Sequence, residues 1–144
     1  LIWQTGKLYT EEAKKRVAEV GKNGIMSFDF ITDMDLAYAA ADIVISRAGA
    51  LAVSELCLVK KPCILVPLPT AAEDHQTKNA LSLVNYNAAI LVKDVDAKSI
   101  LVDEALSLLK DTERCEKLAY NMDKLAFANA TETIVNEVIS LIKK

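Results

Sequence analysis

The segment ISRAGALAVSEL, residues 45–56, combines an arginine and a glycine at the end of an apolar run with a carboxylate inside the following helical pattern. Gly49 can let a ligand approach the backbone closely. The free N–H groups of Ala50 and Leu51 at the helix start form an anion site with the helix dipole. Glu55 lies further along the same helix, roughly 7.5 Å along the axis at about 1.5 Å per residue. This spacing matches the separation of a pyrophosphate from a ribose diol in a nucleotide.

The same turn has a simpler interpretation. In it, Gly49 only makes a tight turn and Glu55 is a solvated surface residue. A strand–glycine–helix sequence taken alone favours this structural interpretation, because its glycine signal is weaker than G-x-G-x-x-G, which the sequence lacks. The residues by themselves leave both interpretations open.

An apolar pair follows another predicted strand, in the segment FITDMDLAYAAAD. Phe30 and Ile31, with their backbone groups, can hold a flat base and read its edge. The alternative is a hydrophobic staple that packs against a helix capped by Asp33. Asp33, Asp35 and Asp42 fit caps and solvated positions, and their spacing does not predict a metal site.

Polar residues gather in a third segment, PLPTAAEDHQTKNA, which holds the only histidine of the sequence. Gln76 and Asn79, which follow His75, are three residues apart and share a helix face, so both can bind sugar hydroxyls. Alternatively, Glu73 and Asp74 cap this helix and the later polar side chains are solvated. A hydrolytic function is disfavoured because no Ser/His/Asp or Cys/His set can be assembled.

The composition predicts one globular domain. The chain has 144 residues, 52% of them hydrophobic, and a net charge of -3, which argues against nucleic-acid binding and against a membrane-surface patch. It contains no apolar run of about 18 residues, so no membrane span is predicted. Cys57, Cys63 and Cys115 lack C-x-x-C spacing and indicate reduced, buried thiols rather than a zinc site.

Apolar runs alternate with helical patterns over the first two thirds of the chain, and helices alone follow. Strands are predicted at 1–4, 25–28, 43–45, 63–66 and 89–92, with Trp3 in the core. Helices are predicted at 10–20, capped by Thr10 and ended by Gly21, and at 33–41, 50–59, 75–85, 97–110, 112–127 and 131–143. This alternation predicts an α/β fold, a Rossmann-like parallel sheet with helices on both faces and a helical C-terminus. Ligands bind such sheets at the carboxyl ends of the strands, where the three segments above lie.

Together, FITDMDLAYAAADIVISRAGALAVSEL and KKPCILVPLPTAAEDHQTKNA closely resemble the C-terminal domain of the MurG family of bacterial glycosyltransferases. The resemblance runs from WQTGK through ATETIVNEV, essentially the whole chain, and three motifs in order are far more specific than one. It implies the C-terminal half of a GT-B glycosyltransferase, with residues 1–144 as a single UDP-sugar donor-binding domain. It further implies inverting transfer of N-acetylglucosamine from UDP-N-acetylglucosamine to lipid I, forming lipid II in peptidoglycan synthesis. No cofactor and no metal are expected.

The resemblance also assigns roles by position. Phe30 and Ile31 match a pair that contacts uracil, Ile31 largely through its backbone. The segment from Arg47 to Leu51 matches one whose amides meet the diphosphate, and Glu55 matches a glutamate that binds the ribose hydroxyls. The implied donor-binding residues are Phe30, Ile31, Arg47, Gly49, Ala50, Leu51, Glu55, His75, Gln76 and Asn79. His75 departs from the family pattern, which often has two glutamines at this place and the next.

The chain opens on LIWQTGK, a strand pattern without a starting Met, which indicates a fragment of a longer protein. The resemblance places a glycine-rich GGS turn and a first strand before Leu1. It places the lipid I site and the proposed catalytic base in an N-terminal domain that this sequence lacks. The fragment is therefore expected to be inactive alone. The whole protein is expected to be peripheral on the cytoplasmic face of the bacterial inner membrane, and apolar surface on the C-terminal helices is expected to meet its other domain.

The sequence leaves three alternatives open. The first is a naturally separate donor-binding subunit of a split GT-B N-acetylglucosaminyltransferase. The second is a non-catalytic α/β interaction module without nucleotide affinity, for which a change at Glu55 would have no effect. The third is a UDP-N-acetylglucosamine epimerase on the same fold, which would need further acid and base residues.

Overall fold

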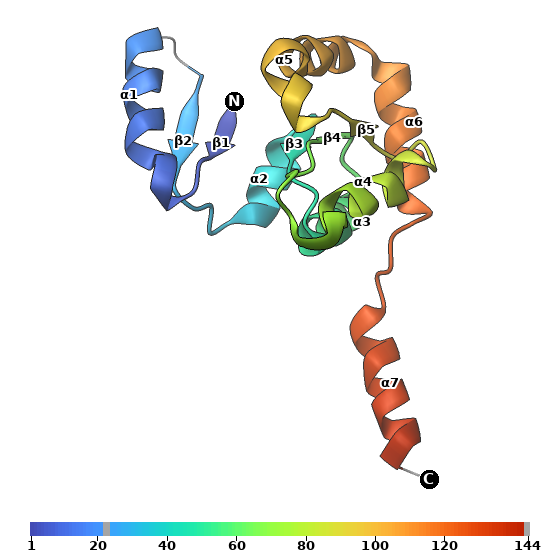
Figure 1. The fold of residues 1–144 in the computed structure, drawn as a ribbon. Coiled ribbons are helices and arrows are strands. Elements are labelled where there is room, and N and C mark those ends of the chain that lie inside the picture. Colours follow the sequence, from blue (N-terminus) through green and yellow to red (C-terminus); the bar gives the residue numbers. More distant parts are fainter. Residues whose placement is uncertain (22–23, 143–144) are drawn as a thin grey trace. The chain divides into compact units, whose positions relative to one another are not determined.

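The computed structural model describes residues 1–21 and 24–142 and forms two compact units, Leu1–Ala41 and Asp42–Lys144 (Figure 1). Parallel strands alternate with helices through both units, and helices alone complete the described part of the second. This arrangement confirms the predicted α/β class with its helical C-terminus. In the described residues the strands form two sheets, β1-β2 in the first unit and β3-β4-β5 in the second.

The first unit is a small parallel βαβ arrangement followed by a short helix. Its elements are β1 (Ile2–Gln4), the 3-10 helix η1 (Lys7–Tyr9), α1 (Thr10–Val20), β2 (Met26–Phe28) and α2 (Met34–Ala40). Gly21 ends α1 in the left-handed conformation, with φ 59°, as its position predicted. The predicted N-cap is wrong, because η1 runs directly into α1 and makes Thr10 the first helical residue after Tyr9. The Thr10 hydroxyl instead donates to the carbonyl oxygen of Gly6 at 2.9 Å.

Trp3 is not a core residue in the first unit. Trp3 is 42% exposed, and most residues of β1 and β2 are exposed as well. α1 contributes only Ala13 to the buried residues described in this unit. A two-stranded sheet with so little helical cover cannot bury a large aromatic side chain, which explains why the prediction for Trp3 was wrong.

The second unit is built around a three-stranded parallel sheet. Its strands are β3 (Val44–Ser46), β4 (Cys63–Leu65) and β5 (Ile90–Leu91), with β4 in the centre. All residues of β4 are buried, as a central strand between two covered faces requires. Ile64 and Val66 face a core that includes Val92, Leu108 and Leu118. Because side chains alternate along a strand, Cys63 and Leu65 point to the opposite face, where both are fully buried.

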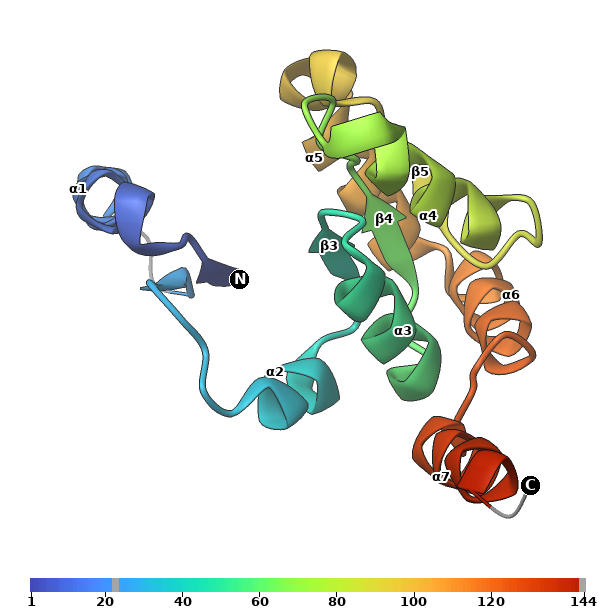
Figure 2. The ribbon, with the colours of Figure 1, turned by 60° about the horizontal axis from the view of Figure 1, so that its bottom comes forward.

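Helices cover both faces of this sheet (Figures 1 and 2). One side holds α5 (Asp94–Lys110) and α6 (Thr112–Asp123), which supply Leu108 and Leu118 to the core. The helices α3 (Ala50–Val59) and α4 (His75–Val84) contact each other, and α4 also contacts β5. The bounds of α3 agree with the prediction. α5 begins three residues before the predicted position 97, because Asp94 and Asp96 favour the first turn of a helix.

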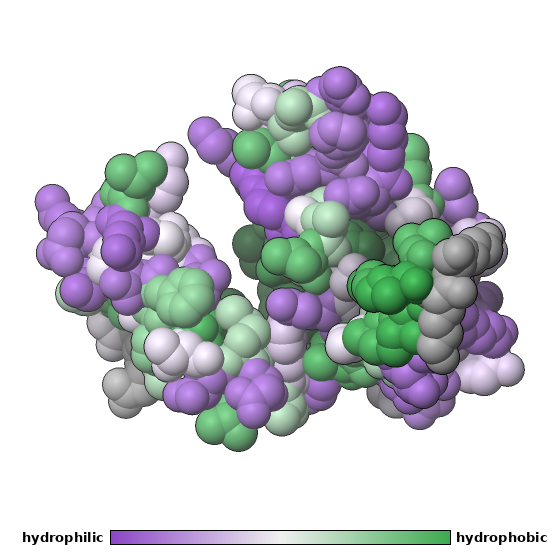
Figure 3. All heavy atoms as spheres, turned by 90° about the horizontal axis from the view of Figure 1, so that it is seen from below, coloured by the Kyte–Doolittle hydropathy of each residue, from purple (hydrophilic) through white to green (hydrophobic). Residues whose placement is uncertain are grey.

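The last helices differ from the prediction mainly at their ends. α6 stops at Asp123, four residues before the predicted end, where turn hydrogen bonds from Leu125 and Ala126 replace the helical pattern. α7 (Ala130–Ile142) begins one residue before its predicted start. None of the described residues of α7 is buried, and hydrophobic side chains gather on this helix in Figure 3. The exposed apolar residues are Ile134, Val135, Val138, Ile139, Leu141 and Ile142.

In the part of the chain that the structure describes, no helix has the length and apolar content that crossing a membrane requires.

Candidate functional site

The loop between β3 and α3 carries the first group of predicted site residues. β3 ends at Ser46, and α3 begins at Ala50, so the residues between them form a short connection at the carboxyl end of the sheet. Ala48 is fully buried and anchors this connection. The hydroxyl of Ser46 donates to the carbonyl oxygen of Arg47 at 2.8 Å. The loop therefore has a defined conformation from its start.

Gly49 does not serve a strained turn. Its φ and ψ are -64° and 149°, values that any residue adopts, so backbone conformation does not require a glycine here. A Cβ built at this position would meet no heavy atom of the described residues within 4 Å. Neither turn geometry nor internal crowding accounts for this glycine. Gly49 is the N-cap of α3, a position at which glycine is among the favoured residues, and it also lets an external group approach the backbone closely.

The start of α3 presents backbone N–H donors next to Gly49. The first helical hydrogen bond runs from the Val53 amide to the Gly49 carbonyl oxygen at 3.0 Å. The amides of Ala50, Leu51 and Ala52 precede that bond and have no carbonyl within the helix to bind. Leu51 is 81% exposed, so its neighbourhood is accessible. This helix start is chemically suited to an anion.

Glu55 is an exposed residue of α3, in the second turn of the helix. Its Cα lies about five residues, or ~7.5 Å, along the axis from the helix start. The Cα–Cβ bond of a helical residue tilts toward the N-terminus of the helix, which favours a Glu55 side chain that leans toward the start of α3. Its carboxylate is a suitable acceptor for two neighbouring hydroxyl groups.

The side chain of Arg47 joins three loops at the carboxyl edge of the sheet. Its Nη1 donates to the carbonyl oxygens of Val66 at 3.2 Å and Pro67 at 3.5 Å, just beyond β4. The same nitrogen forms an ion pair with Oδ1 of Asp94, the first residue of α5. Arg47 was predicted as part of a segment whose amides meet the diphosphate, and Asp94 was not among the predicted site residues. The signal for Asp94 was its place two residues after the predicted strand 89–92, in a loop at the carboxyl edge.

The loop between β4 and α4 is held by Gln76. Its Oε1 accepts a hydrogen bond from the Leu68 amide at 2.9 Å. Because Oε1 is used in this way, the Nε2 end of the carboxamide is the end with donors for another partner. Gln76 is thus both an anchor of the loop and a candidate donor to a sugar oxygen.

The entry to α4 is backbone-strained. Glu73 and Asp74 adopt left-handed conformations, with φ 49° and 56°, which non-glycine residues adopt uncommonly. Asp74 occupies the N-cap position, but in the described residues its side chain makes no cap hydrogen bond. His75 is exposed, and its Nε2 lies 3.7 Å from Oε2 of Glu73. Asp74 therefore stands at the expected N-cap position but does not make the side-chain hydrogen bond expected of a cap.

Asn79 connects α4 with the loop after β3. Its Nδ2 donates to the carbonyl oxygen of the buried Ala48 at 3.0 Å. The contact fixes the Nδ2 end of the Asn79 carboxamide and leaves Oδ1 as an acceptor for another partner. The second unit thus brings Arg47, Gln76 and Asn79 to the same edge of its sheet, through contacts with the loops after β3 and β4.

In the first unit, the predicted base-binding pair follows β2. Phe30 is 64% exposed, and its amide donates to Oδ1 of Asp29 at 2.8 Å. The Ile31 amide donates to Oε1 of Gln4 at 2.8 Å. Gln4 was not among the predicted site residues. Its signal was a polar side chain at the last position of a predicted strand, at the carboxyl end.

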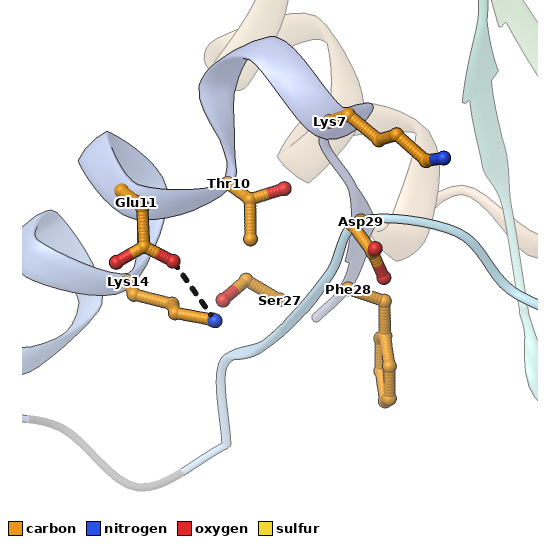
Figure 4. A pocket seen from close by; sticks show the side chains of 7 residues that line it. All are labelled: Lys7, Thr10, Glu11, Lys14, Ser27, Phe28 and Asp29. Carbon is orange, nitrogen blue, oxygen red and sulfur yellow. Dashed lines mark hydrogen bonds and ion pairs between the residues drawn. The ribbon is translucent and has the colours of Figure 1, made fainter.

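A hollow of about 390 Å³ lies elsewhere in the first unit (Figure 4). Its lining combines both signs of charge, and Lys14 is already paired with Glu11 at 3.1 Å. Figure 4 shows the Lys7 side chain extending away from that pair. The lining residues are Lys7, Thr10, Glu11, Lys14, Ser27, Phe28 and Asp29, none of which is a predicted donor-binding residue.

All three cysteines are free, and Cys57 and Cys63 are buried as predicted, whereas Cys115 is only partly buried. Burial raises the pKa of Cys63 to about 12, with a further contribution from nearby Cys57, whose own pKa is raised by burial. Burial also raises the pKa of Cys115. No group of His, Cys, Asp and Glu side chains suited to a metal ion is present in residues 1–21 and 24–142.

Residues 1–138 match the family model described as the glycosyltransferase family 28 C-terminal domain. The chain belongs to this family. The family 28 C-terminal domain therefore accounts for nearly the whole sequence, including every candidate residue named above.

Two curated relatives of the chain carry the same name. A protein of Phocaeicola vulgatus is 52% identical over 144 residues, covering 99% of this chain and 38% of the relative. One of Parabacteroides distasonis is 49% identical, covering 100% of this chain and 39% of the relative. Both are called UDP-N-acetylglucosamine–N-acetylmuramyl-(pentapeptide) pyrophosphoryl-undecaprenol N-acetylglucosamine transferase. The chain thus spans about two fifths of the length of these relatives.

A solved structure supports the same assignment of the family 28 fold. The crystal structure of Acinetobacter baumannii MurG matches with a TM-score of 0.84 and 31% sequence identity. The match covers 96% of this chain and 42% of that one. The resemblance to MurG inferred from the loop motifs is confirmed.

Proposed function

We propose that this chain is the donor-binding domain of an N-acetylglucosaminyltransferase that uses UDP-N-acetylglucosamine and lipid I. The observation that carries the proposal is Gly49, which has an ordinary φ of -64° and open space around its Cα at the start of α3. A glycine that neither strain nor packing requires is suited to close approach by a phosphate. The family membership and the names of the relatives support the same reaction.

Each proposed contact uses chemistry found at its position. The amides at Ala50 and Leu51 bind the diphosphate, and the Glu55 carboxylate accepts hydrogen bonds from the ribose hydroxyls. Gln76 and Asn79, with one end of each carboxamide fixed by the backbone, read hydroxyl groups of the transferred sugar together with His75. Phe30 stacks on the uracil and the Ile31 backbone reads its edge.

The proposed reaction divides its work between this chain and the rest of the protein. Departure of the diphosphate requires stabilisation of negative charge, which the amides at the start of α3 are suited to supply. Attack by the acceptor hydroxyl requires a general base, which we place in the remainder of the longer protein. The acceptor is lipid-linked, so the whole enzyme acts at a membrane surface, and we place that surface on the cytoplasmic side of the bacterial inner membrane.

Calorimetric titration with UDP-N-acetylglucosamine tests the donor site, both on this chain and on the longer protein. We expect saturable binding that is stronger than binding of UDP-glucose or ADP. Glu55→Ala is expected to weaken it roughly tenfold, since hydrogen bonds to charged groups contribute about 1.5–3 kcal/mol. The matched control is Glu116→Ala, an exposed glutamate of α6, which is expected to bind as the wild type does.

A transfer assay with lipid I tests whether the general base lies outside this chain. The longer protein is expected to form lipid II, and this chain alone is expected to form none. Donor binding that is absent from the longer protein, or unchanged in Glu55→Ala, would contradict the assignment of the donor site. Product formation by this chain alone would contradict the placement of the base.

A further inference from the structure

The contacts of Arg47 point to a function for Asp94. Nη1 of Arg47 has three acceptors, the carbonyl oxygens of Val66 and Pro67 and the carboxylate of Asp94. They come from the end of β4 and from the first residue of α5, whereas Arg47 itself follows β3. One nitrogen of Arg47, in the connection after β3, therefore binds acceptors in the connections that follow β4 and β5.

Contacts at one nitrogen orient the whole guanidinium. The group is planar and carries five N–H donors, of which two belong to Nη1 and three to Nη2 and Nε. Fixing Nη1 on three acceptors fixes the plane in which the other three donors lie. Such a held edge can bind two oxygens of a phosphate at once, with better geometry than a mobile side chain.

The place of this arginine in the chain connects it with the diphosphate. Arg47 lies two residues before Gly49 and three before Ala50, where α3 begins. We propose that Asp94 is a positioning residue for the donor, because it holds Arg47 by Nη1 and so presents the opposite edge of the guanidinium to the donor's diphosphate. This inference rests on the proposed function of the α3 start.

The Arg47–Asp94 pair is partly exposed, so a role in positioning Arg47 can be distinguished from a role in stabilising the fold. The side chains are 52% and 35% exposed, and ion pairs with such exposure contribute little to stability. Removal of the Asp94 charge should therefore change donor binding more than it changes the melting temperature.

The direction in which Asp94→Asn changes the affinity for a diphosphate distinguishes a positioning role from a purely electrostatic one. Asp94 carries a negative charge close to a proposed anion site. If it acted only through its charge, Asp94→Asn would strengthen binding of a diphosphate. If it holds Arg47 in place, the same substitution weakens binding, because a neutral carboxamide oxygen holds the guanidinium less firmly than a carboxylate does.

The test uses the longer protein and compares UDP-N-acetylglucosamine, UDP and uridine by calorimetry. Asp94→Asn is expected to weaken binding of both diphosphates roughly five- to tenfold. Uridine, which has no phosphate, is expected to bind equally to both proteins. Asp94→Glu keeps the charge and is expected to restore most of the affinity. Asp96→Asn, in the same first turn of α5, is the matched control for loss of one carboxylate and is expected to bind as the wild type does.

A double-mutant cycle with Arg47→Lys completes the test, because a lysine cannot form the planar, bidentate contact. In that background Asp94→Asn is expected to have little further effect. Unchanged or tighter diphosphate binding in Asp94→Asn overturns the inference, as does an equal loss of uridine binding or a large fall in melting temperature. If the wild type fails to bind UDP-N-acetylglucosamine, the proposed function itself fails and the inference falls with it.

Discussion

Nδ2 of Asn79 on α4 lies 3.0 Å from the carbonyl oxygen of Ala48, which follows β3 and is fully buried. The hydrogen bond joins two connections that are far apart in the sequence. It also determines which end of the Asn79 carboxamide is fixed and which end is left for a ligand. A residue predicted as a sugar contact is therefore also part of the support of the α3 start.

We expect Asn79→Ala to lower the free energy of unfolding by about 1–2 kcal/mol, because the buried carbonyl of Ala48 loses this donor. Urea denaturation of the protein measures the change. Asn85→Ala, at the exposed C-cap of the same helix, is the control and should change the free energy by less than about 0.5 kcal/mol. Equal destabilisation by the two substitutions would show that the hydrogen bond to Ala48 has no special contribution.

Phe30→Ala is expected to lower the affinity for UDP with little change in the free energy of unfolding. Phe30 is 64% exposed, so its removal should change the free energy of unfolding by less than about 0.5 kcal/mol. Affinity for UDP should fall about tenfold, since stacking of an aromatic side chain on a base contributes ~1–3 kcal/mol. Phe127→Ala removes an aromatic residue of similar exposure, 67%, and should leave UDP affinity unchanged. Equal UDP affinity of wild type and Phe30→Ala would remove Phe30 from the site.

Cys63 should make the stability of the protein fall at high pH. Burial raises its pKa from 9.0 to about 12, so between these values the folded state keeps a proton that the unfolded state releases. The contribution is fully present below pH 9 and is lost as pH rises toward 12, at most about 1.4 kcal/mol per pH unit. Denaturation at several pH values between 8 and 11 measures this slope.

The matched variant for that experiment is Cys63→Ala, because the titrations of other groups are common to both proteins. The variant is expected to be less stable overall and to show a shallower decline above pH 9. Parallel declines in the two proteins would contradict a strongly raised pKa at Cys63.

The apolar residues of α7 should cause self-association when this chain is separated from the longer protein. Ile134 and Val138 are four residues apart on one helix face, with 63% and 50% exposure. We expect sedimentation of this chain at high micromolar concentration to give a mass above that of one chain. The double variant with Ile134→Asp and Val138→Asp should sediment as a monomer. Val102→Asp, on α5, is the control, and loss of association there as well would point to a different surface.

The sequence by itself determined the local elements and the chemical character of the loops. α3 begins at Ala50 and ends at Val59 as predicted, because its apolar pattern and the preceding glycine are local signals. Gly21 ended α1 for the same reason, as the residue that adopts φ > 0 without steric cost. The family was also readable from the sequence, since three loop motifs occur in one order over the whole chain.

Only the tertiary structure decided which of these residues form contacts within the protein itself. Arg47 and Asp94 are 47 positions apart, Asn79 and Ala48 are 31 apart, and Gln4 and Ile31 are 27 apart. No local pattern pairs such residues, because they meet only when the ends of parallel strands come together at one edge of a sheet. The exposure of Trp3 had the same origin. A tryptophan in a strand is buried only if a neighbouring layer covers that face, and cover depends on packing rather than on local sequence.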